Sequence, residues 1–261
     1  MGNLMPRNCL YLAFTFLILL LTGSSAYALG VEFALGGWRQ DASGDLAYKA
    51  VGPDDVLSVA DDLNYDSEDR FQGRLKIDLP LLLPNIAIMA APAEFSATGQ
   101  KDVDFTFGDE TFAGSVPFHS KLTFNQYDVT LFYGLPFIKT ATLSKLNVDL
   151  GINVRIADLE ASIRQESTGA EESYDVTAAV PQLYLAVQLM PVDWLAIEGE
   201  GRGIAIGDSR MYSLIGRLRF NVWGPAFIAG GYRLDRIDVD EDDLDADFAI
   251  GGPFAEVGMS F

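Results

Sequence analysis

The sequence predicts an all-β protein, a closed antiparallel transmembrane β-barrel of about ten strands. Two features carry this prediction. Long segments repeat the two-residue period of a strand, and the connections between them fall into a short class and a long class. A third feature, an apolar leader, indicates that the chain is exported. Together they favour the kind of barrel found in bacterial outer membranes.

The leader has the layout of a secretory signal peptide. Arg7 supplies the positive charge, Leu10 begins an apolar run, and Ala26 and Ala28 are the small residues that precede a cleavage site. The run is short of the ~20 residues that a membrane-spanning helix needs. We therefore expect residues 1–28 to be removed and residues 29–261 to form the barrel domain.

Strict alternation of apolar and polar residues recurs along the rest of the chain. It is clearest from Leu146 to Ile156, where every even position is apolar, and it returns over 71–79 and 212–222. Ten strands are predicted in all, near 30–39, 69–80, 85–97, 121–134, 143–157, 174–190, 194–206, 210–222, 226–236 and 250–261.

The connections separate into two rims. Tight ones lie near 81–84, 135–142, 191–193 and 223–225, and long polar ones lie near 40–68, 98–120, 158–173 and 237–249, with a shorter one near 207–209. This arrangement is typical of periplasmic turns and outer loops, and an even strand number places both termini on the periplasmic side. The barrel must close because lipid cannot satisfy an open sheet edge. If two of the segments are hairpins within outer loops, the barrel has eight strands.

Aromatic residues mark the expected membrane interfaces. Phe137, Trp194 and Trp223 sit at short turns, and Trp38 lies near the outer end of the first strand, so we predict that these four belong to aromatic girdles. The last strand ends on alternating apolar residues, Val257, Met259 and Phe261. This ending resembles the C-terminal signal that the barrel assembly machinery recognises.

At this point the chain resembles a family of proteobacterial outer-membrane β-barrel proteins of unknown function that carry a Gly-Gly signature. The matching pieces, in order, are Val31–Trp38, Asp41–Gly44, Leu79–Asn85, Gln126–Asp128, Glu198–Gly201, Gly230–Arg233 and Gly252–Phe254. The resemblance implies a barrel in the outer membrane of a Gram-negative bacterium. It implies no established activity and no catalytic residues.

Composition excludes several function classes. The formal net charge is −19, from 37 acidic and 18 basic residues, which argues against nucleic-acid binding. One histidine and one cysteine, Cys9 in the leader, leave too few ligands for zinc, iron–sulfur or haem centres and no disulfide. We expect no cofactor.

Charged residues of both signs lie on the strand faces opposite the apolar stripes. We predict that they line the lumen, either as a packed ion-pair network or as a narrow polar channel whose selectivity they set. They are Arg74, Lys76, Asp78, Asp128, Asp149, Arg155, Glu198, Glu200, Arg202, Arg217, Arg219, Arg233 and Glu256.

The outer loops carry three further features. Acidic residues crowd the first and last loops, where Asp238, Asp240 and Asp242 are weak candidates for a cation site, although the spacing excludes an EF-hand. Phenylalanines of the second loop favour a hairpin that extends the wall and turns at Gly108, with an exposed apolar patch as the alternative. His119, also in the second loop, is the only imidazole and stands beside Ser120.

These observations lead to one main functional hypothesis and two alternatives. The main one is a structural or binding barrel, or a narrow pore for small solutes, with no enzymatic activity. The alternatives are a surface adhesin or cation-binding protein that uses the acidic loops, and a rim protease or lipid hydrolase that uses His119. The expected surroundings are outer-membrane lipid and lipopolysaccharide, and the expected state is a monomer.

Overall fold

The computed structural model describes residues 29–80, 83–207, 209–241 and 244–261. The predicted signal peptide, residues 1–28, lies outside the described residues. Within the described part, none of the helices has the length and apolar character needed to cross a membrane.

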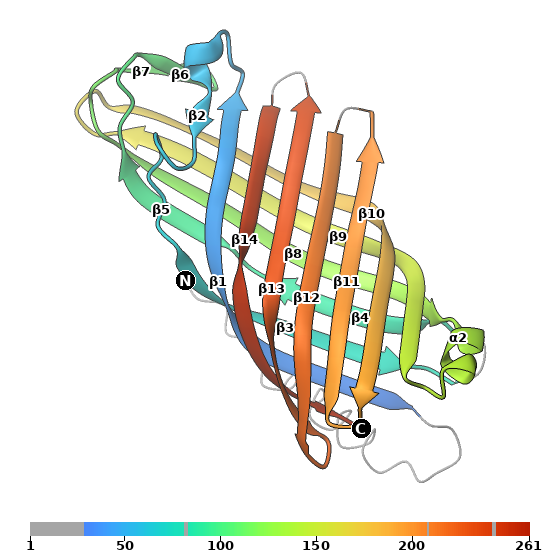
Figure 1. Ribbon diagram of the computed structural model, residues 1–261. Helices are drawn as coiled ribbons and strands as arrows, with labels where there is room; N and C mark the ends of the chain where they lie inside the picture. Colours follow the sequence, from blue (N-terminus) through green and yellow to red (C-terminus); the bar gives the residue numbers. More distant parts are fainter. Residues whose placement is uncertain (1–28, 81–82, 208, 242–243) are drawn as a thin grey trace, which may run out of the picture.

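Ten antiparallel strands close into a barrel (Figure 1). Each barrel strand pairs with the next one along the chain, and the last pairs with the first. Ten strands were expected, so the eight-strand alternative is wrong. The barrel strands are β1 (Gly30–Tyr48), β3 (Glu68–Asp78), β4 (Asn85–Ala91), β8 (Phe118–Gly134), β9 (Leu146–Gln165), β10 (Ala170–Val192), β11 (Leu195–Ile206), β12 (Ser209–Trp223), β13 (Ala226–Glu241) and β14 (Leu244–Ser260).

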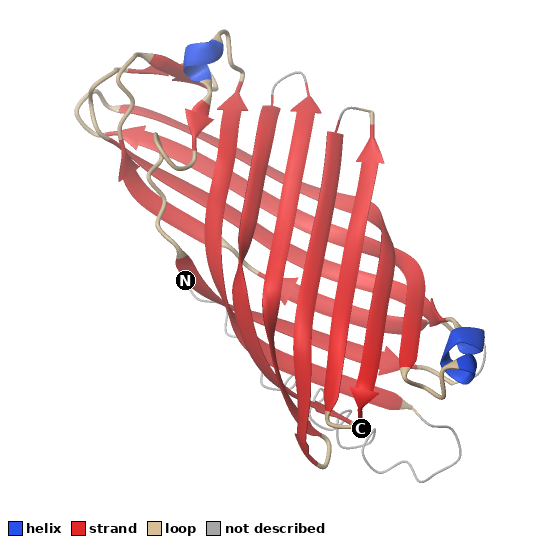
Figure 2. Ribbon diagram, viewed as in Figure 1, coloured by secondary structure: helices blue, strands red, loops and turns tan. Residues whose placement is uncertain are grey.

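Shorter elements decorate the two ends. β5 (Glu94–Gly99) continues along β8 beyond β4, after an interruption at Pro92, which has no N–H to give to a ladder. At one end, the loop end, β2 (Leu57–Ser58) and the short helix η1 (Pro53–Asp55) follow β1. The opposite end, the turn end, carries the helix α2 (Pro136–Ala141) where a tight connection was expected. Figure 2 shows these two helical segments at opposite ends of an otherwise all-β molecule.

The outer surface near the turn end is a belt of exposed apolar side chains. On β9 the even-numbered residues Leu150, Ile152 and Val154 face outward, while Asn153 and Arg155 are fully buried inside. Ile197, Leu218, Val257 and other outward residues continue the belt around the barrel. Such a belt, with polar residues inside, is the surface that a lipid bilayer accepts.

Toward the loop end the strands run further than the sequence predicted, and their polarity inverts. Residues 158–165 of β9 and 237–241 of β13 were expected to be loop. In this part of β9 the inward residues up to Ile163 are apolar, with Ile163 only 3% exposed, and the outward residues, such as Glu160, are polar. The strands were predicted too short because only segments with apolar residues on the outward face were interpreted as barrel strands.

The predicted phenylalanine hairpin is present at the loop end, but it does not extend the wall. β6 (Phe105–Phe107) and β7 (Glu110–Phe112) pair with each other in a separate two-stranded sheet, with the turn at Gly108. Their phenylalanine rings are buried, Phe112 completely, so they form no exposed patch either. The rings instead belong to the apolar core at this end of the barrel, and Figure 1 shows the hairpin at the loop end, near β2.

Candidate functional site

The interior of the barrel has two unlike parts along its length. At the loop end, apolar side chains from the wall, from residues 57–63 and from the β6–β7 hairpin pack into one core. At the turn end the interior is polar and encloses a cavity of about 870 Å³. The lining of this cavity reaches Gly30, Asn85, Pro136 and Ser260, which lie at the short-turn ends of their strands. The cavity is therefore the candidate site.

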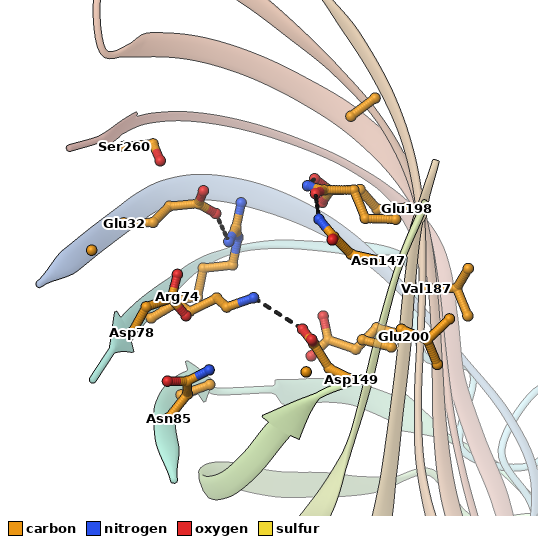
Figure 3. Close-up of a pocket in the computed structure, with 18 of the residues that line it drawn as sticks. Glu32, Arg74, Asp78, Asn85, Asn147, Asp149, Val187, Glu198, Glu200 and Ser260 are labelled. Atoms are coloured by element: carbon orange, nitrogen blue, oxygen red, sulfur yellow. Dashed lines mark hydrogen bonds and ion pairs between the residues drawn. The ribbon is translucent and has the colours of Figure 1, made fainter. Parts of the chain in front are cut away.

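Ion pairs between strands line the cavity (Figure 3). Arg74 on β3 bonds Glu32 on β1 and contacts Glu256 on β14 at 2.9 Å. Lys76 contacts Asp149 across the lumen at 3.1 Å. These pairs bridge elements far apart in sequence, because alternate residues on every strand project toward the same axis.

The opposite wall carries a second group of pairs. Arg217 on β12 reaches Glu198 at 3.3 Å and Glu200 at 3.1 Å, both on β11. Arg202 bonds Glu200, and Arg219 bonds Glu32. The wall is thus a connected network in which most carboxylates accept from two cations.

A fully buried charged layer separates the cavity from the apolar core. Arg155 makes a bidentate contact to Asp128, with both N–O distances at 2.9 Å. Arg233 pairs with Asp235 at 2.8 Å and lies over the ring of Trp38, 4.6 Å from its centroid. Bidentate geometry is the arrangement that compensates best for removing two charges from water.

The thirteen predicted lumen charges all lie on the inner side of the barrel. Most line the cavity; Asp128, Arg155 and Arg233 belong to the buried layer, Glu256 holds Arg74, and Asp78 is exposed at the cavity mouth. Two acids of the network, Glu32 and Asp235, were missed. Both could have been found from the two-residue period of a strand, which puts residues two apart on the same face. Asp235 is two residues from Arg233, and Glu32 is two residues from Ala34, which faces inward.

The girdle assignment of Trp38 is wrong. Its side chain is only 1% exposed, and its Nε1 donates to the carbonyl oxygen of Gly252 at 3.2 Å. Trp38 is an even-numbered residue of β1 and shares the inner face with Ala34 and Gln40, whereas Phe33 and Leu35 face outward. Position at the strand end suggested a girdle, but side-chain parity decides which face the indole takes.

The other predicted surface aromatics face outward. Trp194, Trp223 and Phe137 are exposed at the turn end, on the connections or strand ends where they were expected. Val257, Met259 and Phe261 are also exposed, on the outer face of the last strand. Their roles in a girdle and in assembly stay predictions.

His119 was expected in a loop, but it lies on β8, opposite Arg164 of β9. It faces outward, whereas Ser120 next to it is buried on the inner face. Adjacent strand residues point to opposite faces, so these two side chains cannot form a dyad. His119 lines only a small hollow of about 430 Å³, together with Glu166 and Ser167.

The described residues do not place the predicted cation-site acids, Asp238, Asp240 and Asp242, around a common point. Asp238 pairs with Arg210, 2.7 Å from its Nε, and Asp242 lies outside the described residues. The side chain of Asp240 is likewise outside what the structure describes. In the described part of the chain, no group of three acidic, histidine or cysteine side chains is placed to hold a metal ion.

The chain has the fold of outer-membrane β-barrels. The outer-membrane protease OmpT from Escherichia coli is similar with a TM-score of 0.53 at 10% sequence identity, over 92% of this chain and 100% of that one. The translocator domain of the autotransporter NalP from Neisseria meningitidis gives 0.43 at 9% identity, over 98% and 96%. Ail from Yersinia pestis gives 0.36 at 11%, over 89% and 98%.

No protein-family model matches the chain, and no curated protein matches it either. The resemblance to the Gly-Gly family is therefore not confirmed. The similarity to OmpT shows that the two chains share a barrel architecture.

Proposed function

We propose that this protein is an outer-membrane barrel that is closed toward the cell exterior and binds a small polar solute from the periplasm. One observation carries the proposal: the polar cavity opens at the turn end, whereas a packed apolar core fills the loop end. The turn end faces the periplasm in barrels of this construction. A solute therefore enters and leaves by the same mouth.

The proposal places the chain in the outer membrane of a Gram-negative bacterium, exported through its leader. The apolar belt supports insertion in lipid, and the order in which the short matching motifs occur along the chain supports a relation to the Gly-Gly family. Of the earlier alternatives, it takes the binding barrel over the narrow pore and over a rim enzyme. A pore needs a water-filled path, and in the described part of the barrel the apolar core and the buried layer of Arg155 and Arg233 lie across the interior, which supports a closed lumen.

The first test is conductance of refolded residues 29–261 in a planar bilayer. Protein that migrates as a folded barrel should give no steady channel conductance. Reproducible steps would overturn the closed lumen. Only preparations that migrate as a folded barrel are counted, so that silence from unfolded protein is not mistaken for a closed lumen.

The second test measures access to the cavity. Residues 29–261 contain no cysteine, so a single introduced thiol reports its own surroundings. Gln188→Cys lies on the cavity lining, and Ala157→Cys lies in the apolar core. A charged methanethiosulfonate reagent should modify the first rapidly and the second at least a hundredfold more slowly. Equal rates would contradict a cavity open at the turn end.

A further inference from the structure

Arginines of the interior differ in how completely their nitrogens are hydrogen-bonded. Arg74 uses all three, two on Glu256 and one on Glu32. Arg233 also uses all three, on Asp235, Gln72 and Gln126. Such saturation is expected, because a buried N–H without an acceptor costs about 1–3 kcal/mol.

Among the described arginines, Arg202 leaves the most buried nitrogens without an acceptor, two, whereas Arg70, Arg155 and Arg217 leave one each. Only Nη2 of Arg202 has an acceptor, Glu200, and both Nε and Nη1 are buried without one. The side chain is only 4% exposed, yet it lines the cavity. Arg217 beside it also leaves its Nε without a hydrogen bond. Among the residues that line the cavity, the buried donors without acceptors therefore belong to Arg202 and Arg217.

The surroundings of Arg202 supply the rest of a site. Tyr184, its cross-strand partner on β10, places its ring 5.4 Å from the guanidinium carbon and also lines the cavity. Met89, Ala196 and Ile215 are buried apolar residues of the same lining. Pockets of this kind hold an apolar body and orient it through a few polar groups.

We propose that the cavity binds a small carboxylate with an apolar body, its oxygens on the free N–H groups of Arg202 and its body beside Tyr184. Carboxylate oxygens are strong acceptors for guanidinium donors. The ion pairs around the site are balanced, since seven cations pair with seven acids among the described residues: Arg74, Lys76, Arg155, Arg202, Arg217, Arg219 and Arg233 with Glu32, Asp128, Asp149, Glu198, Glu200, Asp235 and Glu256. Donor capacity, and not net charge, selects the ligand. The inference rests on the proposed function.

The test is calorimetric titration of residues 29–261 in nonionic detergent with sodium benzoate. Benzylammonium chloride, which has similar shape and opposite charge, and sodium chloride at equal ionic strength are the comparison ligands. One benzoate should bind per barrel, with neither comparison ligand binding. Equal heats for all three would overturn the proposal and indicate that water alone satisfies Arg202.

Two variants locate the site. Arg202→Lys keeps the charge but removes the planar donor set, and it should weaken benzoate binding at least tenfold. Arg233→Lys makes the same exchange outside the cavity lining and should leave the affinity within twofold. Equal losses in both would overturn the assignment of the site to Arg202.

If Arg202→Lys fails to fold, Ala186→Trp serves instead. Ala186 lines the cavity two residues from Tyr184, so the larger ring narrows access without removing any charged side chain. Benzoate binding should fall at least fivefold, and unchanged binding would contradict the site. Labelling of Gln188→Cys distinguishes failure of the carboxylate proposal from failure of the proposed function. Rapid labelling without benzoate binding rejects only the carboxylate ligand. Slow labelling rejects a cavity that is open at the turn end.

Discussion

The turn half and the loop half of this barrel are built from the same strands with opposite polarity. In the turn half, β9 presents Ile152 and Val154 outward and Arg155 inward; in the loop half, it presents Glu160 outward and Ile163 inward. β13 and β14 change in the same way, with Ile237 and Phe248 buried inside the loop half. The same barrel thus has the apolar exterior of a membrane protein in its turn half and the apolar core of a water-soluble protein in its loop half.

The difference is the one expected of a barrel whose turn half lies in lipid and whose loop half lies in water. Where lipid surrounds the wall, apolar residues face outward and the interior receives charges, which must then pair. Where water surrounds the wall, burial of apolar surface becomes the favourable term and the lumen fills with a core. Stability should therefore come from apolar packing in the loop half and from paired charges in the turn half.

The largest effect should come from the apolar core. Phe112→Ala removes a fully buried ring and should lower the free energy of unfolding by about 3–5 kcal/mol. Phe71→Ala is the matched control, because Phe71 is 86% exposed on the outer wall. Denaturant unfolding of both variants, followed by tryptophan fluorescence, measures the difference. Equal losses would break the contrast between the two faces.

A single break in the charged layer should have a comparable or slightly smaller effect. Asp128→Ala leaves Arg155 buried without its bidentate partner and should cost about 3 kcal/mol in unfolding free energy. Replacing both residues by leucine should recover most of that loss, because no unpaired charge remains. The same unfolding assay compares the single and double variants. A double variant as unstable as the single one would mean that the pair itself stabilises the barrel.

The cap at the loop end should respond to acid. Burial opposes ionisation of Asp55, but backbone N–H donors of Thr106 at 2.6 Å, Val51 at 2.7 Å and Gly52 at 2.9 Å outweigh it and lower the pKa of this carboxyl. A lowered folded-state pKa contributes stability above the unfolded value near 4, and this contribution is lost as pH falls through the folded-state value.

Asp55→Asn should therefore cost about 1–3 kcal/mol at neutral pH, with less difference from the native protein in acid. Hydrogen exchange of the Thr106 amide, measured from pH 7 down to pH 3, reports the anchoring directly. A constant difference between the two proteins across this range would exclude the carboxylate as the anchor.

The smallest expected effect is at the boundary between the halves. Trp38→Phe removes the hydrogen bond to Gly252 and part of the surface on which Arg233 lies, and should cost about 1 kcal/mol. The variant should also lose a blue-shifted component of the tryptophan emission, because Trp38 is buried while Trp194 and Trp223 are exposed. An unchanged spectrum would contradict the inward position of Trp38.

Sequence reasoning was strongest in the exposed apolar belt, where one face of each strand is apolar and the other is polar. The run Leu146–Ile156 predicted its strand, and the thirteen lumen charges followed from the opposite face. It was weakest beyond the belt. There the strand continues, but apolar residues such as Leu159 and Ile163 face inward and polar residues face outward, and this segment was predicted to be a loop. Glu32 and Trp38 were misjudged for a related reason, since their position along the chain was read before their parity.

By itself the sequence determined the alternation, the strand number and the presence of charges of both signs on the inner face, because a two-residue period assigns every residue to a side of the wall. Only the tertiary structure decided which charges meet, that the β6–β7 hairpin folds into the core, and that Arg202 keeps free donors. Those outcomes depend on closure of the barrel, which brings β1 beside β14 and residues such as Arg74 and Glu256 into contact across most of the chain.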